Sequence, residues 1–123
     1  MTNVTPPAYA TYIRAARQRM ETASTRWMER REQAWVIARQ ATAFIKEKYP
    51  QASVRVFGSL LYPDSFGPRS DIDLALDGVG WPEYLHLWSA LERQLSEFVI
   101  DLVDVNIVAP ELRAHIEREG EPL

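Results

Sequence analysis

A long stretch without glycine or proline constrains the fold more than any other feature of this sequence. Residues 7–48 contain no glycine and, after Pro7, no proline. Apolar residues recur there every three or four positions, which is the spacing of one helix face. They are Tyr9, Tyr12, Ile13, Ala16, Met20, Ala34, Trp35, Ala38, Ala41 and Ile45. The stretch predicts helix up to Tyr49-Pro50, because the residue before a proline is driven out of the α region. Residues 22–25 are its weakest part and leave open whether it forms one helix or two.

The rest of the chain alternates short strands and helices. The predicted strands are residues 54–57, 71–76 and 99–105. Between the first two, residues 60–70 are expected to form a turn or brief helix and then a loop. One helix is expected to begin at Pro82 and to run through about Glu97. Its predicted apolar face consists of Tyr84, Leu85, Trp88, Leu91, Leu95 and Phe98. The last helix is predicted to have Pro110 at its start, Leu112 and Ile116 facing inward, and Gly120 as its C-cap. This order indicates an α/β or α+β domain in which helices cover a small sheet.

Composition limits the chemistry that this chain can carry. Its 123 residues suit one compact domain, and an apolar share of 46% is enough for a core. The absence of cysteine excludes disulfides, a thiol nucleophile and a thiolate zinc site. Only His86 and His115 could supply imidazole, and they are far apart in sequence. Any metal is therefore expected to be held mainly by carboxylate oxygens, as magnesium and calcium are.

Charge is divided unevenly along the chain. Residues 1–50 carry nine Lys/Arg and four Asp/Glu, whereas residues 51–123 carry five and thirteen, within a net charge of −3. The arginines of the first half are interspersed with glutamates, which favours a solvated or partner-facing helix over direct nucleic-acid binding. No stretch approaches the roughly 18 apolar residues of a membrane span, and no basic start precedes an apolar leader. We therefore expect a cytoplasmic protein without membrane contact.

The segments that carry chemistry are a Gly-Ser pair and three acids. Gly58-Ser59 follows a predicted strand, where a residue without Cβ lets backbone N–H groups approach a phosphate. Asp71 and Asp73 are two residues apart on the next strand, so both side chains are expected on one face. Asp101, from a later strand, would complete a carboxylate site for two divalent cations, which suits phosphoryl or nucleotidyl transfer.

In these segments the sequence resembles the minimal nucleotidyltransferases of the DNA polymerase β superfamily, in particular the antitoxin partners of HEPN-domain ribonucleases. The resemblance covers about residues 34–123. The matching segments are residues 56–59 (VFGS), 70–74 (SDIDL), 99–105 (VIDLVDV), 110–113 (PELR) and 116–120 (IEREG). The implied fold is a small mixed nucleotidyltransferase sheet packed with helices, here preceded by a helical N-terminal extension.

The resemblance assigns the acids to metal binding. It implies that Asp71 and Asp73 bind magnesium, with two ions expected, and that a third acid assists them. Position in the family strand assigns the third acid to Asp101. Asp104 is the alternative, three residues further along the same strand and so on its opposite face.

The resemblance also assigns residues to the nucleotide, with ATP as co-substrate. Gly58 and Ser59 are implied to hold the triphosphate, and Ser70 is expected to add a contact. Family members often place a basic residue shortly after the serine, where this chain has residues 60–62 (LLY). Arg69 is the expected substitute. The loop of eleven residues, 60–70, is one residue longer than is usual in the family.

The implied activity is that of an antitoxin-type protein adenylyltransferase. It would transfer AMP from ATP to a hydroxyl, by family resemblance a tyrosine, of a HEPN ribonuclease toxin in a hetero-oligomer with that toxin. The chain has no room for an acceptor domain of its own, so the partner protein must present the hydroxyl. The alternative is a catalytically weak or inactive module that neutralises its partner by direct binding.

Two units are expected along the chain. Residues 1–33 would form the helical N-terminal extension and residues 34–123 the minimal nucleotidyltransferase domain. The basic part of the extension, about residues 8–30, precedes the matched core and has neither acid pair nor glycine turn. We expect it to contact a partner protein. Packing on its own domain is the alternative.

Overall fold

The N-terminal part of the chain is one uninterrupted helix. The computed structural model describes residues 8–123, and helix α1 (Ala8–Lys48) occupies the first 41 of them. The helix passes through residues 22–25 without a break, which settles the question of one helix or two. It ends directly before Tyr49-Pro50, as predicted. Residues 1–7 of the predicted extension lie outside the described residues.

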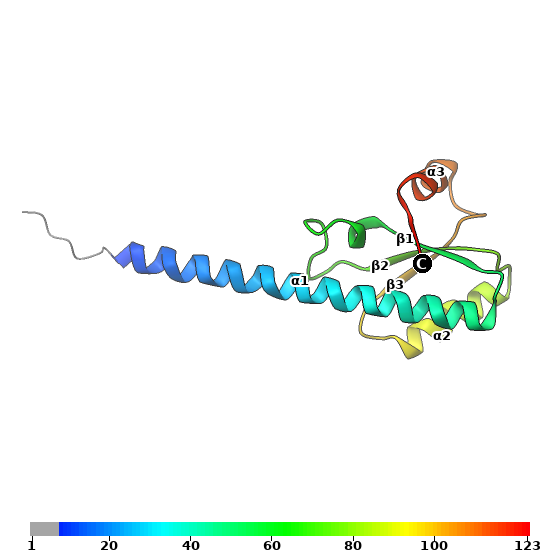
Figure 1. Cartoon of the computed structure of the whole chain (residues 1–123), viewed down its shortest axis with the longest axis horizontal. Coiled ribbons are helices and arrows are strands. Elements are labelled where there is room, and N and C mark those ends of the chain that lie inside the picture. Colours follow the sequence, from blue (N-terminus) through cyan, green and yellow to red (C-terminus); the bar gives the residue numbers. More distant parts are fainter. Residues whose placement is uncertain (1–7) are drawn as a thin grey trace, which may run out of the picture.

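A four-stranded mixed sheet forms the centre of the domain (Figure 1). The elements after α1 are β1 (Ser53–Phe57), the 3₁₀ turn η1 (Gly58–Leu61), β2 (Ile72–Asp77), α2 (Glu83–Gln94), β3 (Ile100–Asp104), α3 (Pro110–Glu119) and β4 (Glu121–Pro122). The strand order is β3-β2-β1-β4. Strand β1 is antiparallel to β2 and β4, whereas β2 and β3 are parallel. The expected α+β fold with a small mixed sheet is confirmed.

Helices cover both faces of the sheet, unequally. Alternate strand residues such as Val56, Leu74 and Leu102 join α1 and α2 in the main core. The other face carries a small cluster of Phe57, Ala75 and Ile116, contributed by β1, β2 and α3. Figure 1 shows α3 on the side of the sheet opposite to α1 and α2. Because α3 is short, it leaves part of its face of the sheet open.

Helix α2 differs from its predicted form in length and at two positions of its apolar face. It ends at Gln94 rather than at Glu97, and its buried residues are Leu87, Ala90 and Leu91. Leu85 and Trp88, which were predicted to face the core, are 39% and 37% exposed. Tyr84 does face the sheet, because it packs on the main core and its hydroxyl donates to the Leu102 carbonyl of β3. Its ring also contacts those of Trp81 and Trp88, with centroids 5.7 and 6.5 Å apart.

Strand β4 was not predicted from the sequence. It comprises only Glu121 and Pro122, which pair with Val56 and Arg55 of β1. A two-residue segment containing proline gives no periodic signal, so it is recognisable only through its partner strand. The pairing brings the C-terminal residues against β1 at the edge of the sheet.

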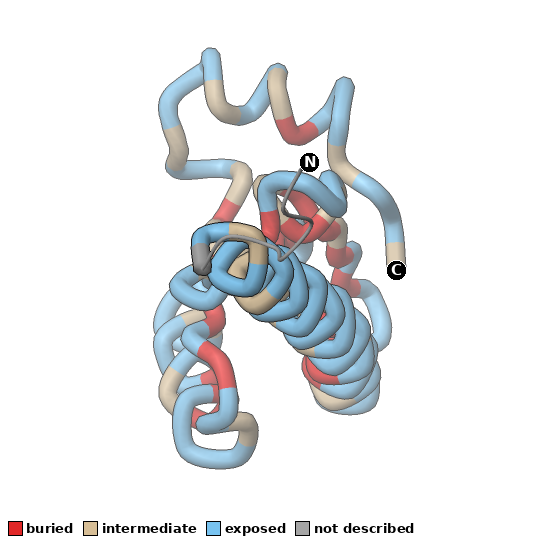
Figure 2. The backbone as a smooth tube through the Cα atoms, turned by 90° about the vertical axis from the view of Figure 1, so that its left-hand side faces the viewer, coloured by how far each residue is buried: buried red, intermediate tan, exposed pale blue. Residues whose placement is uncertain are grey.

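The first half of α1, residues 8–29, extends beyond the sheet as a free arm (Figure 1), and Figure 2, which looks along the arm, shows it mostly exposed. Buried positions of α1 begin at Ala34, and Tyr9, Met20 and Met28 on the arm are each at least 65% exposed. The domain boundary predicted at residue 33 lies within this helix and stays a prediction. Within the described range, none of the helices is long and apolar enough to cross a membrane.

Deleting residues 1–24 should leave the domain folded. The described side chains removed are exposed or only partly buried, so we expect the free energy of unfolding to change by less than about 0.5 kcal/mol. Urea denaturation of the full chain and of the deletion variant measures this directly. A loss of several kcal/mol would show that the arm packs on its own domain.

Candidate active site

Two acids face each other across neighbouring strands on the partly open face of the sheet. Asp73 of β2 is the parallel-pair partner of Asp101 of β3, and on its other side it pairs with Phe57 of β1. Strand alternation places Asp73 on the face of Ala75, which belongs to the small cluster under α3. Asp71 is exposed and directly precedes β2. The structure therefore brings together Asp73 and Asp101, with Asp71 two residues before Asp73.

The charges of these acids act on one another. The pKa of Asp73 is raised from 3.8 to about 6, first by burial of the half-buried carboxyl and then by the negative charges of Asp101 and Asp71. Nearby like charges and low polarity both disfavour the ionised form. The site thus concentrates negative charge that is not offset, and a cation would relieve this repulsion.

Gly58 lies directly against the Asp73 carboxylate. Its φ of +76° is in the left-handed region, which a side chain disfavours. A Cβ built on Gly58 would lie 2.3 Å from Asp73 Oδ2, far inside contact distance. The turn after β1 therefore requires glycine for two reasons, its backbone conformation and the approach of the acid. The Gly58 turn therefore lies beside the Asp73–Asp101 pair.

The other residues predicted to contact the nucleotide differ in burial and in their hydrogen bonds. Ser59 is partly buried in η1, one residue after Gly58, and its carbonyl accepts a hydrogen bond from the Tyr62 N–H. Arg69 is exposed at the end of the loop. The Ser70 hydroxyl accepts a hydrogen bond from the Gly67 N–H at 2.9 Å, so it also stabilises the loop. Nucleotide binding by these residues remains a prediction.

The alternative third acid, Asp104, lies on the opposite face of the sheet. It pairs with Leu76 of β2 and is 5% exposed. Its Oδ1 accepts a hydrogen bond from the Asn106 N–H at 2.9 Å. Asn106 in turn donates from Nδ2 to Asp77 Oδ1 at 3.0 Å. Asp104 therefore holds the turn after β3, away from Asp73.

Two arginines of α1 fasten the loop that connects η1 to β2. Arg31 Nε donates to the Leu60 carbonyl at 3.0 Å. Arg30 donates from Nε to the Gly67 carbonyl at 3.3 Å and from Nη2 to the Ser70 carbonyl at 3.4 Å. These contacts tie the start and the end of the loop to one helix. In the sequence both residues appear only as part of a basic stretch, so their contacts with their own domain could not be distinguished from a role at an interface.

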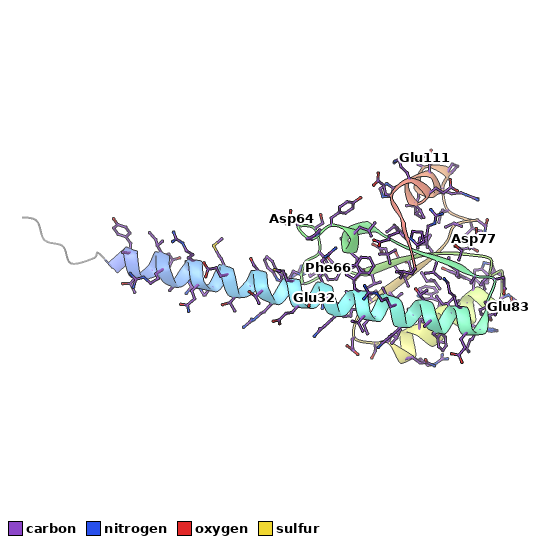
Figure 3. All side chains as sticks on the ribbon, viewed as in Figure 1. Glu32, Asp64, Phe66, Asp77, Glu83 and Glu111 are labelled. Atoms are coloured by element: carbon purple, nitrogen blue, oxygen red, sulfur yellow. The ribbon has the colours of Figure 1, made fainter. Side chains whose placement is uncertain are left out.

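Arg30 also stacks on aromatic rings. Its guanidinium carbon lies 4.4 Å from the ring centroid of Phe98 and 5.9 Å from that of Phe66. Figure 3 shows Phe66 between the loop and α1, with Asp64 further out. A cation over an aromatic face adds about 0.5–2 kcal/mol, depending on desolvation. Arg30 thus stabilises the loop from which Asp71 and Asp73 follow.

Replacing Arg30 with alanine should loosen this loop. We expect the free energy of unfolding to fall by about 1–2 kcal/mol, because two hydrogen bonds and the ring contacts are lost. Amide hydrogen exchange of residues 60–70 should accelerate. Arg26→Ala, which removes an exposed arginine of the free arm, serves as the control and should change neither quantity. Unchanged exchange in Arg30→Ala would show that the loop does not depend on α1.

The residues at this site suit a hard divalent cation by donor type. Asp71, Asp73 and Asp101 offer carboxylate oxygens, and the glycine at position 58 keeps the space beside Asp73 free of a side chain. Among residues 8–123, no three His, Cys, Asp or Glu side chains are already arranged to hold a metal ion. The donor set thus fits magnesium, and the carboxylates would have to move closer together to bind it.

Comparison with solved structures shows the same fold. A protein described as a minimal nucleotidyltransferase is 28% identical, with a TM-score of 0.57 over 73% of this chain and 95% of that one. A toxin–antitoxin structure with AMP-PNP is 20% identical, with a TM-score of 0.56 over 69% and 70%. The MntA-HepT toxin–antitoxin structure is 18% identical, with a TM-score of 0.53 over 72% and 69%. At 18% and 20% identity, the similarity to the two toxin–antitoxin structures shows a shared fold.

The family is shown by sequence. No curated protein matches the chain significantly. The family model for polymerase beta nucleotidyltransferases matches residues 40–123, which include the sheet, the Gly58 turn and all the acids described above. This chain therefore belongs to the polymerase beta nucleotidyltransferase family.

Proposed function

We propose that this protein is a magnesium-dependent adenylyltransferase that transfers AMP from ATP to a hydroxyl of a HEPN-type toxin, by resemblance a tyrosine, with pyrophosphate as the leaving group. The observation that carries the proposal is the pairing of Asp73 with Asp101 beside the Gly58 turn. Three carboxylates and an open glycine turn within a nucleotidyltransferase fold are the parts that nucleotidyl transfer requires. The similarity to a toxin–antitoxin structure with AMP-PNP supports both the nucleotide and the class of partner.

The chain's own residues divide the work of this reaction. Asp71, Asp73 and Asp101 would hold two magnesium ions, which offset phosphate charge and lower the pKa of the acceptor hydroxyl when bound. Gly58 leaves room for the triphosphate, and Ser59 offers a hydroxyl beside it. Asp101, which is exposed, would accept the proton of the incoming hydroxyl. Its position opposite Asp73, with Asp104 buried on the other face, supports Asp101 as the third acid.

In this proposal the acceptor hydroxyl belongs to a partner protein. Residues 40–123 are taken up by the nucleotidyltransferase domain, and the remaining described residues are a single helix. The similarity to the MntA-HepT structure supports a toxin as that molecule. A partner that brings its own hydroxyl to the exposed edge of Asp101 fits this arrangement.

Transfer of label from α-³²P-ATP to a candidate toxin tests the proposal. The native protein should label the toxin in the presence of magnesium, and Asp101→Asn should reduce the rate by about a hundredfold or more. Asp64→Asn is the matched control, because Asp64 is exposed on the loop and lies outside the acid pair. No labelling by the native protein, together with toxin neutralisation by Asp101→Asn in cells, would favour neutralisation by contact instead.

A further inference from the structure

The free arm of α1 carries an apolar seam with the repeat of a coiled coil. Successive members are alternately four and three residues apart, so that they follow one side of the helix. The seam consists of Tyr9, Ile13, Ala16, Met20, Ala23 and Trp27. Continued along α1 with the same spacing, it passes Arg30, which contacts the loop, and then reaches Ala34, Ile37 and Ala41, which are buried in the domain's own core. The seam is therefore the exposed continuation of a helix face that already packs against other elements.

The large side chains of the seam are exposed to water. Tyr9 is 65% exposed, Met20 70%, Ile13 47% and Trp27 45%. A contiguous apolar surface of this kind marks a place of interaction. Most of the stability of helices in proteins comes from packing of an apolar face, so the arm gains from a partner helix. The arm thus has both the surface and the need for a second helix.

Three of the six positions that flank the seam are basic, and none is acidic. The basic ones are Arg17, Arg19 and Arg26, and the others are Ala10, Tyr12 and Ser24. The two glutamates of the arm, Glu21 and Glu29, are at outer positions of the repeat, away from the seam. Flanking charges decide which helices pair. Two copies of this arm would offer these arginines no flanking acid to pair with, so the complementary occupant is an acidic helix.

The width of the seam favours a helix over a membrane surface. Two of its six members are alanines, and the apolar residues beside it are Ala10, Tyr12 and Ala15, two of which are also small. Helices that lie in a membrane surface have a broader and bulkier apolar face, whereas a narrow stripe is typical of paired helices.

The seam ends beside the loop that leads to the candidate active site. A groove of about 350 Å³ lies there, lined by Ser24, Trp27, Met28, Pro63, Asp64 and Phe66. Three of these residues belong to α1 and three to the loop after η1. A helix seated on the seam would therefore end close to the loop that Arg30 and Arg31 hold in place.

We propose that residues 9–27 form a two-stranded coiled coil with a partner helix that has apolar seam positions and acidic flanking positions. This docking surface goes beyond AMP transfer, because it holds a partner whether or not the acids are active. Its partner chemistry is specified by the three flanking arginines and the narrow apolar seam.

Two synthetic helices probe the surface. Both have leucine at the seam positions over three heptads, one with glutamate and the other with lysine at every flanking position. Titration of the full-length protein, monitored by calorimetry, should show binding of the glutamate peptide at least about tenfold tighter than of the lysine peptide. This preference should weaken when salt is raised from about 50 to 500 mM.

Variants on the arm make the test specific. The triple variant Arg17→Glu, Arg19→Glu, Arg26→Glu should reverse the preference between the two peptides, and Met20→Ser should weaken both. Val36→Ser is the control, because Val36 is 48% exposed on α1 but outside the seam. ATP affinity should remain unchanged in all of them, which separates failure of docking from failure of the proposed transfer.

Several results would overturn the proposal. Absence of binding to the glutamate peptide, or equal binding of both peptides, would rule out an acidic helix as the partner of the arm. If the peptide-free protein dimerises as its concentration rises, and if Met20→Ser abolishes this dimerisation, then the partner of the arm is a second copy of the same protein. Binding of the arm to vesicles of anionic lipid, at the salt concentration of the titration, would replace the acidic helix with a membrane surface.

Discussion

Replacing Asp73 with asparagine should abolish nucleotidyl transfer while making the metal-free protein more stable above about pH 6. The activity is expected to fall by about a hundredfold or more, because a carboxylate at the centre of the acid group is lost. The stability gain arises from the same cause, since an amide carries no charge to be repelled by Asp101 and Asp71. A gain in stability at the expense of function is the signature of a residue selected for chemistry.

The sign of the pH effect follows from the raised pKa of Asp73. The folded protein binds the proton more tightly than the unfolded chain, so the native protein is favoured while Asp73 is protonated. That contribution is fully present below about pH 4 and is lost as the pH rises to about 6. The native carboxyl is half-exposed and screened by water, so we expect Asp73→Asn to gain on the order of 1 kcal/mol at pH 7.5 and almost nothing at pH 4.

Thermal denaturation in EDTA at both pH values, for the native protein, Asp73→Asn and the control Asp64→Asn, measures this difference. Adding magnesium at pH 7.5 should raise the melting temperature of the native protein more than that of Asp73→Asn. An Asp73→Asn variant that is less stable than the native protein at pH 7.5 would contradict the electrostatic account.

Gly58→Ala should impair ATP binding far more than it impairs folding. The new Cβ would meet Asp73 Oδ2 at 2.3 Å, and the end of that side chain can turn away. The fold should therefore lose only about 1 kcal/mol, mainly from the left-handed backbone at residue 58. The displaced carboxylate and the blocked approach should weaken ATP binding in the presence of magnesium by about tenfold or more. Gly58→Val should be worse, because a branched side chain fills more of the same space.

The loop supplies a matched control for this substitution. A Cβ on Gly67 would meet nothing within 4 Å, so Gly67→Ala should change neither ATP affinity nor stability appreciably. Isothermal calorimetry of all three variants gives the comparison. If Gly58→Ala bound ATP as tightly as the native protein, the phosphates of ATP would not lie beside Gly58.

Much of the fold could be predicted because its elements have strong local signals. The end of α1 follows from Tyr49-Pro50, and strand β2 follows from the alternation of Ile72, Leu74 and Leu76, all of which are buried. The pairing of Asp73 with Asp101 is different in kind. Local periodicity says which face of its own strand each acid occupies, and only the parallel register of β2 and β3 brings them together. Family resemblance assigned Asp101 as the third acid in advance, but the register came only from the structure.

The features that escaped prediction depend on contacts between distant segments. The Arg30 contacts join residues about forty positions apart, and any exposed arginine has the same sequence appearance. The exposure of Leu85 and Trp88 depends on which part of α2 meets the sheet, and apolar spacing within the helix does not specify this. The raised pKa of Asp73 is likewise a property of its folded surroundings, since burial is its largest cause.

Because α1 is continuous, the length of the arm sets both how far its seam reaches and in which direction the seam faces. Residues 8–29 span about 33 Å, and Arg30 and Arg31 of the same helix hold the loop that leads to the candidate active site. Each residue added to the arm would turn its seam by about 100° around the rod, whereas seven added residues would shift it by about 10 Å and nearly restore its direction. Insertions of seven residues could therefore lengthen the arm and keep the direction of its seam, whereas a single inserted residue would turn the seam away from the loop.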